Sequence, residues 1–466
     1  MKKLFLTLSL LPALIVLLPC SVLFAQTPLP FDELGAGPRA TAMGQAFTAL
    51  ADDPAAAYYN PAGLTQIKSP FHLTLGFQYA KPLVTVAFDE EPVQNPWLGR
   101  GEFSQTEDLA THGLYVGYCF NFSEISAFSD SAIASRISHG MTLFTNIPEV
   151  NQFDNPQRPQ DPYVFKYNER WSLISLAISF AFRCTDWLSI GGGILPRVDS
   201  IQESRGSWIT LNGVIDPDDP SRGMRLDLRA TTKINVVPIA GILVRPPIGS
   251  LRDKVSIGVS YRGKIWGFYG TGMTTVDIVI ERPNNPPILL YRDPGGKTID
   301  YIGFTPQQVT VGVAWKPSDK FTAAFDLTWK DYSEFHFFWD MPPDPAFVDV
   351  WVPRMGLSYR FEPDFEGKYP GRFEAIEVMT GYYRENSPVP DMSGPMNILD
   401  ADQNVISGGV AIRYDAAWTG HVKLEAFFQA HLLEDNRIEN DDDLLFGPVT
   451  VGGKVYNGGI AISIVY

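Results

Sequence analysis

The sequence has little of what enzymes, nucleic-acid-binding proteins and disulfide-stabilised domains require. Only 3 cysteines occur in 466 residues, too few for a disulfide framework. Lysine and arginine number 37 against 52 aspartates and glutamates, and this net charge of −15 argues against nucleic acid as a partner. The motifs G-x-x-x-x-G-K-[ST], G-x-S-x-G and H-E-x-x-H are absent. We therefore predict no cofactor, no metal site and no enzyme activity, with a membrane-embedded lipase as the weaker alternative.

Long apolar runs are also missing once the first 25 residues are set aside. These residues contain Lys2-Lys3, an apolar run over 4–18 and Ala25 before Gln26, a pattern typical of a secretory signal peptide. Nothing later reaches the ~20 apolar residues of a membrane helix, which excludes a helical inner-membrane protein. We expect residues 1–25 to be removed on export, which takes the charge to −17. The cysteines that remain, Cys119 and Cys184, either pair or are unrelated strand residues.

In place of long apolar runs, the chain has short segments in which apolar residues alternate with small or polar ones. The alternation is clear in residues 71–80 and again in 321–330. Because successive side chains of a strand point to opposite faces, each segment has one apolar face. In 321–330 the opposite face carries polar residues, among them Asp326 and Lys330.

Three features favour a membrane barrel over a soluble sandwich. The segments are about ten residues long, which suits a tilted transmembrane strand. Short turns alternate with long polar loops. Aromatic residues make up 13% of the chain and cluster at segment ends, as interfacial girdles require. The tryptophans concerned are Trp171, Trp187, Trp266, Trp315, Trp329, Trp351 and Trp418. In an exported protein these features predict an all-β, multi-pass barrel in the outer membrane of a Gram-negative cell.

The segments make about fourteen antiparallel strands, an even number as expected for a closed single-chain barrel. The predicted strands are residues 71–80, 112–121, 136–146, 170–183, 186–198, 224–245, 254–264, 306–316, 320–332, 350–361, 373–385, 403–414, 419–432 and 454–466. We predict that the tight links at 184–185, 317–319 and 415–418 face the periplasm. The long connections at 199–223, 265–305, 333–349, 386–402 and 433–453 are predicted to be extracellular.

The stretch before the first strand has a different composition. Residues 40–50 are compatible with helix, Asp52-Asp53-Pro54 can end one helix and start another, and Asn60-Pro61 is a turn signal. The candidate residues are the hatch motif Asn60, Pro61, Ala62 and Gly63, and the apolar side chains Phe47, Leu50, Tyr58 and Tyr59. We expect residues 26–70 to form a small helical hatch that plugs the lumen of a barrel made by residues 71–466.

The C-terminal segment alternates isoleucines on one face and ends the chain on the aromatic residue Tyr466. Such a strand can be recognised by strand pairing, so we expect barrel-insertion machinery to bind it. The plain alternative is a final apolar strand without that role. A second expected contact is outer-membrane lipid or lipopolysaccharide. The acidic run 439–443 could bind calcium or bridge lipopolysaccharide through divalent ions, but its spacing is not that of an EF-hand, and a solvated loop is the simpler interpretation.

Three blocks, taken in order, resemble the FadL-type outer-membrane transporters of long-chain fatty acids and aromatic hydrocarbons, including their toluene-transport relatives. They are GPRATAMGQAFTALADDPAAAYYNPAGL (37–64) with its Asn-Pro-Ala motif, TPQQVTVGVAWKPSDKFTAAFDLTWKDYSEF (305–335) and EVMTGYYRENSPVPD (377–391). The resemblance implies a fourteen-stranded barrel closed by an N-terminal hatch. It implies passive uptake without ATP, with capture in an extracellular groove, a pocket beside the hatch and lateral exit through the wall. It also implies that Asn60 and Pro61 gate this exit, where the residues alone suggest a helix terminator.

Two predicted loops are unusually apolar. The groove candidates are Trp266, Phe268, Tyr269, Phe335, Phe337, Phe338 and Trp339, with Ile288, Leu289 and Leu290 beside them. Exposing such a set is unfavourable unless it is buried or binds something. Ligand capture and packing of the loops over the barrel mouth explain it equally well, and the two can coexist.

A fatty-acid cargo would need a basic residue for its carboxylate. Candidates that face inward by strand parity are Arg197, Arg225, Arg229, Arg262, Lys316 and Lys330. The simpler interpretation of each is a lumen charge paired with an acidic residue. The cargo is therefore a hydrophobic small molecule (a fatty acid, an alkane or an aromatic hydrocarbon) with its head group open. A non-transporting barrel that anchors or shuttles secreted or surface proteins is the alternative function.

Overall fold

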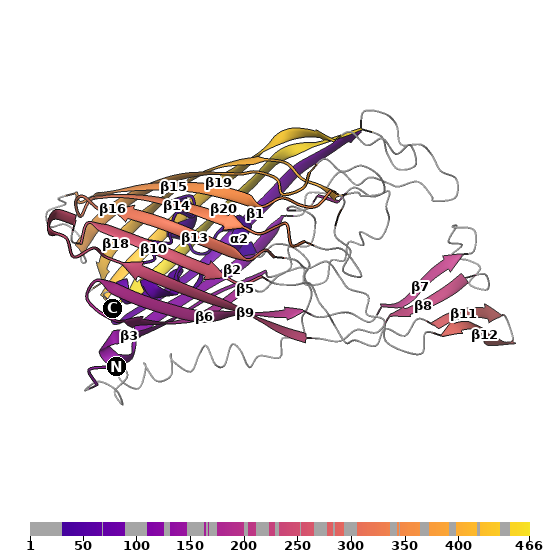
Figure 1. Ribbon diagram of the computed structural model, residues 1–466, viewed down its shortest axis with the longest axis horizontal. Coiled ribbons are helices and arrows are strands. Elements are labelled where there is room, and N and C mark those ends of the chain that lie inside the picture. The colour runs from indigo at the N-terminus through magenta and orange to yellow at the C-terminus, as the bar shows by residue number, and fades with distance from the viewer. Residues whose placement is uncertain are drawn as a thin grey trace.

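A computed structural model describes residues 30–67, 69–88, 110–124, 131–146, 163–164, 166, 175–199, 204–210, 223–228, 233–251, 253–264, 277–282, 285–292, 305–335, 343, 345–363, 372–390, 398–416, 420–438 and 448–466. Its main element is a closed barrel of fourteen strands (Figure 1). The strand β20 (Val449–Val465) closes it by antiparallel pairing with β1 (Phe71–Phe88). The predicted fold class and strand number are confirmed.

The barrel strands follow one another around the wall in chain order. Between β1 and β20 they are β2 (Thr111–Asn121), β3 (Ile137–Asn146), β5 (Ser175–Arg183), β6 (Leu188–Asp199), β9 (Lys233–Val244), β10 (Val255–Arg262), β13 (Gln308–Trp315), β14 (Phe321–Lys330), β15 (Val350–Phe361), β16 (Arg372–Glu385), β18 (Gln403–Ala416) and β19 (Gly420–Ile438). The gaps in this numbering belong to strands outside the barrel.

The alternation in the sequence sorts side chains between the two faces of the wall. In β15, Trp351, Met355 and Leu357 point outward and are exposed, whereas Val352 and Arg354 point inward and are buried. Apolar outward residues recur on the other strands and form a belt around the barrel. A continuous apolar belt of this kind is stable in lipid rather than in water.

Some predicted strand bounds are wrong. Residues 224–245 are two strands in different sheets, β9 in the barrel and β8 (Gly223–Leu228) outside it. A period of two continues through both, so the pattern does not reveal the change of sheet. β1, β19 and β20 are longer than predicted, because β1 and β20 keep pairing from Lys81 to Phe88. The predicted lengths follow from the thickness of the membrane, and these three strands extend beyond the length that a membrane requires.

The connections predicted at 199–223 and 265–305 contain strands of their own. β7 (Ser204–Thr210), β11 (Asp277–Arg282) and β12 (Asn285–Arg292) join β8 in a four-stranded sheet with the order β12-β11-β8-β7. Short apolar and β-branched runs such as 277–280 supply its strands. A further two-residue pair, β4 (Tyr163–Val164) with β17 (Ile398–Leu399), is parallel.

The two ends of the barrel differ. At the end that we call the short-turn end, brief links at 184–187, 245–254 and 316–320 join neighbouring strands. The 3₁₀ helices in the links at this end are η2 (Phe122–Glu124), η3 (Ala134–Arg136) and η5 (Gly249–Leu251). The opposite, long-loop end carries the long connections, and the four-stranded sheet lies beyond it, whereas the C-terminus lies at the short-turn end (Figure 1).

The segment before β1 lies inside the barrel, and we call residues 30–67 the plug. Its helices are α2 (Pro30–Leu34), α3 (Pro38–Ala42), α4 (Ala56–Tyr59) and the 3₁₀ helix η1 (Pro61–Gln66). α3 packs on β16, β18 and β19, and α4 and η1 pack on β3, β5, β6 and β9. The predicted helical plug in the lumen is confirmed. None of the helices in the described residues is long and apolar enough to span a bilayer.

The helix expected over residues 40–50 ends early, at Ala42. Gly44 and Gln45 have φ values of 64° and 60°, in the left-handed region, so the chain turns there. A Cβ on Gly44 would overlap the backbone of Met355 and Tyr382 in the wall. Close packing of the plug backbone on the wall therefore overrides the helix propensity of this stretch.

Candidate functional site

Asn60 joins the plug to the wall. Its side-chain amide donates to the carbonyl of Thr48 at 2.8 Å and to that of Ile242 on β9 at 3.1 Å. Its side-chain oxygen accepts from the backbone N–H of Ala62 at 3.1 Å and so caps η1, where Pro61 takes the first position. Asn60 thus ends α4, as the helix-terminator interpretation predicts, and it also starts η1 and ties the plug to the wall.

The wall is shaped to receive this residue. A Cβ at Gly241 of β9 would overlap the Asn60 side-chain oxygen, so the approach requires glycine. Ala62 and Gly63 follow Asn60 and Pro61 in η1, and both are buried.

The four apolar plug residues named from the sequence lie in or beside its core. Phe47 and Leu50 are fully buried there. Tyr59 meets Phe47 edge-on at 5.7 Å between ring centroids, and its hydroxyl accepts from the N–H of Ala36 at 3.0 Å. Tyr58 packs edge-on against Tyr59 at 5.3 Å. These contacts pack the plug residues against one another.

The polar inner face of the wall binds the plug backbone. The carboxylate of Asp326 on β14 accepts from the N–H groups of Phe47 at 2.9 Å and Thr48 at 2.8 Å. The hydroxyl of Ser407 accepts from Gly44 N at 2.9 Å and donates to Ala42 O at 3.0 Å. Three further wall hydroxyls donate to plug carbonyls: Thr142 to Pro54, Ser179 to Ala57 and Ser256 to Ala49. The wall side chains therefore hydrogen-bond the plug backbone from Ala42 to Ala57.

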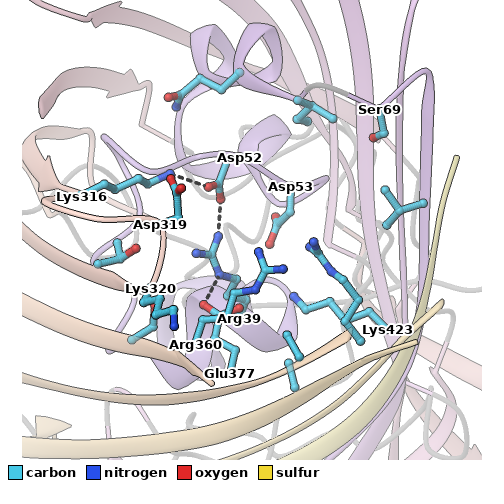
Figure 2. Close-up of a pocket in the computed structure, with 18 of the residues that line it drawn as sticks. Arg39, Asp52, Asp53, Ser69, Lys316, Asp319, Lys320, Arg360, Glu377 and Lys423 are labelled. Atoms are coloured by element: carbon cyan, nitrogen blue, oxygen red, sulfur yellow. Dashed lines mark hydrogen bonds and ion pairs between the residues drawn. The ribbon is translucent and has the colours of Figure 1, made fainter. Parts of the chain in front are cut away.

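On its short-turn side the plug faces a cavity of about 1040 Å³, which we call the vestibule. Figure 2 shows Arg39 of α3 between Asp52 and Glu377, with Lys316 on the other side of Asp52. The lining holds 8 lysines and arginines and 6 aspartates and glutamates, so it favours water and ions over hydrocarbon.

The two neighbouring aspartates of the vestibule differ in their ionisation. Burial opposes ionisation of Asp52, but the Arg39 and Lys316 cations outweigh it and hold the pKa of Asp52 well below its usual range. Burial and the adjacent Asp52 carboxylate instead raise the pKa of Asp53 to about 7. Asp52 is therefore the charged anchor of the plug, and Asp53 changes its charge near neutral pH.

On the opposite, long-loop side, the plug meets an apolar cluster. Phe31 of α2 lies 4.8 Å from Tyr58 and 6.3 Å from Phe144 of β3, measured between ring centroids. The inward-facing residues Tyr115, Ala177, Leu195 and Val237 complete the wall side of this cluster. The described residues of this cluster are buried and apolar, unlike the charged lining of the vestibule.

Beside this cluster, the pairing between two wall strands stops early. The β5–β6 ladder runs from Arg183↔Ser189 to Ile178↔Ile194 and ends there. Ala177 and Leu195 are in described strands, and β6 continues to pair with β9 up to Asp199, yet residues 175–177 pair only with β3. Pro196 has no N–H to donate at this level.

The described basic residues that were candidates for binding a carboxylate already have acidic partners. Arg262 pairs with Asp32 at 2.8 Å, Lys316 with Asp52 at 2.9 Å and Lys330 with Glu385 at 2.7 Å. These three residues are therefore lumen charges paired with acidic residues, as the simpler interpretation predicts.

The other three candidates are placed differently. Arg197 lies on β6, where its backbone is opposite Asn235. Arg225 lies on β8, outside the barrel, so the expectation that it faces the lumen is wrong. The alternation of β8 runs on into β9, so the sequence predicts a single wall strand there. Arg229 lies outside the described residues.

Of the groove candidates, only Phe335 is described. It is buried, stacks on Phe347 at 4.4 Å between centroids, and belongs to an apolar cluster with Tyr332, Val350 and Tyr383 at the long-loop end. Trp266, Phe268, Tyr269, Phe337, Phe338 and Trp339 lie outside the described residues. Ile288, Leu289 and Leu290 lie on β12, in the four-stranded sheet. Cys119 and Cys184 are both free.

The sequence did not identify the polar groups that bind the plug or the buried charged residues on its long-loop side. Strand parity placed Asp326 on the inner face but could not name its partners in the plug. Glu385 and Lys166 are fully buried, and Asp32 and Glu33 lie in a helix that was not predicted. An acidic residue at an inward position of a wall strand was the available signal.

An apolar outer belt, a closed barrel and a plugged lumen define a membrane-spanning transport protein whose central passage is blocked. A family model described as outer membrane protein transport protein (OMPP1/FadL/TodX) matches residues 31–450, and the chain belongs to this family. The resemblance found in the sequence is thereby confirmed. Membership places the protein in the outer membrane of a Gram-negative cell. The comparison with curated protein sequences finds no match.

Solved structures of similar fold come from the same group of proteins. A Pseudomonas aeruginosa FadL homologue is 14% identical with a TM-score of 0.53, over 96% of this chain and 99% of that one. The deltaS2 mutant of the monoaromatic hydrocarbon channel TodX is 13% identical with a TM-score of 0.55, over 94% and 100%. The P. putida toluene transporter TodX is 13% identical with a TM-score of 0.50, over 93% and 99%. At these identities the similarity establishes the fold.

Proposed function

We propose that the protein takes up hydrophobic small molecules across the outer membrane without an energy source. Cargo enters at the long-loop end, reaches the apolar cluster beside the plug and leaves sideways through the barrel wall. The observation that carries this proposal is the contrast between the two sides of the plug. A buried apolar cluster lies on the long-loop side, and a charged vestibule lies on the straight route to the other end.

The region between β5 and β6 supports a lateral exit. Ala177 and Leu195 belong to the apolar cluster and lie where the ladder between the two strands has ended. Parting two strands that share no hydrogen bonds exposes no new backbone polar groups to lipid. A hydrophobic molecule leaving there passes from one apolar surface to another, whereas passage through the vestibule would require it to enter a charged aqueous space.

The relatives support the choice of cargo class. The TodX structures carry the descriptions toluene transporter and monoaromatic hydrocarbon channel, and the family is one of outer-membrane transport. We extend a hydrophobic cargo to this chain, with capture by the apolar loops around Phe335. We also propose export through the signal peptide, contact of the belt with outer-membrane lipid and lipopolysaccharide, and recognition of β20 and Tyr466 by the insertion machinery.

Joining β5 to β6 tests the exit. If the ladder continued, Ala177 and Leu195 would be its next pair, so Ala177→Cys and Leu195→Cys place two thiols across the gap. The background carries Cys119→Ser and Cys184→Ser. We expect cells with the joined protein, linked by oxidation or a short bifunctional maleimide, to lose most uptake of a radiolabelled alkane. Reducing the disulfide restores uptake.

The matched control joins two strands whose ladder is complete. Ala314 and Ala324 are direct partners in the β13–β14 pair and are both buried. Ala314→Cys with Ala324→Cys should leave uptake unchanged. If uptake persists with β5 and β6 joined, the exit lies elsewhere. If the unmodified protein takes up no hydrophobic compound at all, the non-transporting anchor becomes the better function.

A further inference from the structure

The first described helix, α2, lies where apolar clusters of the lumen meet. Phe31 belongs to the cluster beside β5 and β6, and Leu34 belongs to a second cluster along β1, β19 and β20. The carbonyl of Leu34 accepts from the side chains of Gln78 at 3.1 Å and Asn457 at 2.9 Å. α2 is thus fixed on the long-loop side of the plug, along the route that we propose for cargo.

The two acidic residues of α2 have opposite surroundings. Asp32 pairs with Arg262 at 2.8 Å, accepts from the Tyr58 hydroxyl at 2.6 Å and from the Gln308 amide at 3.3 Å. Glu33 is 3% exposed, and neither of its carboxylate oxygens has a hydrogen-bond partner among the described residues. A buried carboxyl group without a partner is unfavourable, and its retention calls for an explanation.

The lysines near Glu33 are already engaged. Lys330 pairs with Glu385 at 2.7 Å, and Lys166 pairs with Asp400 at 3.3 Å, all four with side chains at most 1% exposed. Lys166 also lies 3.6 Å from Glu385, so the two lysines share the carboxylates of Glu385 and Asp400. Glu33 is the third carboxyl group beside two lysines and is therefore the surplus acid of the group.

The arginines on this side of the plug are also engaged elsewhere. Arg262 pairs with Asp32, and Arg354 donates to the Thr328 hydroxyl at 2.9 Å and lies over the Tyr383 ring. Among the described residues, none of these lysines and arginines forms an ion pair with Glu33. When Glu33 is ionised, the apolar route carries an excess negative charge.

We propose that Glu33 is a charge filter that makes the protein select hydrophobic molecules without a carboxylate over their carboxylate-bearing analogues. This inference rests on the proposed uptake function and narrows its cargo class. In a poorly solvated lumen a second carboxylate is repelled by Glu33, whereas an alcohol can donate a hydrogen bond to it. Hydrocarbons pass without an electrostatic penalty.

The filter is sensitive to pH. Burial and the nearby Glu385 carboxylate raise the pKa of Glu33 to about 7, against the opposing effect of the two lysines. The charged and titratable groups facing it are Asp32, Lys166, Tyr332, Lys330, Tyr383 and Glu385. Glu33 is therefore charged above pH 7 and neutral well below it, so discrimination against a carboxylate weakens as the pH falls through this value.

Calorimetry with the protein in lipid nanodiscs tests the filter, with 1-octanol and octanoate as a pair of equal chain length. Heats from empty nanodiscs are subtracted. Above pH 7 we expect the unmodified protein to bind octanol more tightly than octanoate. Glu33→Gln should raise the affinity for octanoate about tenfold, as expected from removing a like charge at roughly 10 Å with an effective dielectric of about 20. Its affinity for octanol should stay within about twofold of the original.

The matched control is Glu362→Gln, which removes one carboxylate from the vestibule lining and should leave the preference unchanged. If Glu33→Gln fails to fold, the pH dependence of the unmodified protein still tests the filter, because its preference for octanol over octanoate must weaken below pH 7. Equal binding of both compounds above and below pH 7 would overturn the filter and leave the uptake function standing. Binding of neither compound would overturn the uptake function itself.

Discussion

The two sides of the plug use charged residues in different ways. In the vestibule, Arg39, Asp52 and Lys316 form ion pairs whose side chains are 11–35% exposed. On the long-loop side, Lys330 and Glu385 are 1% exposed, next to apolar clusters. The ion pairs of the vestibule are partly exposed to solvent, whereas the Lys330–Glu385 pair on the long-loop side is almost fully desolvated.

This difference shows that one kind of interaction can serve two purposes in one lumen. Pairs that remain partly solvated contribute little stability and leave a space compatible with ions. Desolvated pairs make a single arrangement strongly favoured, because breaking one leaves an unpaired buried charge. The plug therefore separates the water-compatible vestibule from a desolvated region of packed side chains, and the predictions below test this separation.

The largest effect is expected from removing the boundary. Deleting residues 35–67 exposes the polar inner wall to water from end to end. We expect the barrel to insert and to conduct ions in a planar bilayer, whereas the intact protein conducts little. Conductance as low as that of the intact protein would mean that these residues do not close the lumen.

Breaking one ion pair on each side compares the two environments directly. Lys330→Met leaves Glu385 short of its partner in the dry region and should lower the free energy of unfolding by about 3–5 kcal/mol. Lys316→Met in the vestibule should lower it by about 0–1 kcal/mol. Urea unfolding followed by tryptophan fluorescence measures both.

A double variant checks the reason for this difference. Adding Glu385→Leu to Lys330→Met removes the uncompensated charge and should recover most of the lost stability. Equal losses from the two single variants would show that the two sides have the same dielectric character.

Asn60 lies on the boundary, and its loss should have an intermediate effect. Asn60→Ala leaves the carbonyls of Thr48 and Ile242 without this donor, so we expect a loss of about 1–3 kcal/mol. The matched control is Asn386→Ala, an exposed asparagine whose side chain accepts from Arg384 at 3.1 Å, and it should change stability by no more than about 0.5 kcal/mol. A higher conductance of Asn60→Ala would show that the bond also holds the plug closed, and an effect no larger than that of the control would contradict this account.

A separate test concerns the pH response of the vestibule. The pKa of Asp53 rises from 3.8 to about 7 on folding, so its contribution is complete below pH 3.8 and is lost as the pH rises to about 7. Asp53→Asn cannot ionise. The urea midpoint of Asp53→Asn, relative to that of the unmodified protein, should therefore rise between pH 3.8 and about 7. Above pH 7 the difference between the two midpoints should stay constant. A constant difference between the two proteins would show that Asp53 ionises normally.

The sequence alone predicted the barrel because the relevant signal is local. Alternation such as that of residues 321–330 assigns every side chain to one of two faces, and an apolar outer face defines a membrane wall. The plug was also predictable in kind, because residues 35–67 break the period of two and are rich in small residues. Local chemistry likewise indicated that Asn60 and Pro61 start a new turn.

Only the tertiary structure decided which groups meet. Phe47 and Asp326 are 279 positions apart in the chain, and nothing local pairs them. The end of the helix at Ala42, the early end of the β5–β6 ladder and the change of sheet between β8 and β9 all depend on contacts with distant segments. Whether a buried acid is matched by a cation is a property of the packed lumen. For that reason the sequence could name Lys330 but could not show that it pairs with Glu385. Nor could it show that the Glu33 carboxylate has no hydrogen-bond partner among the described residues.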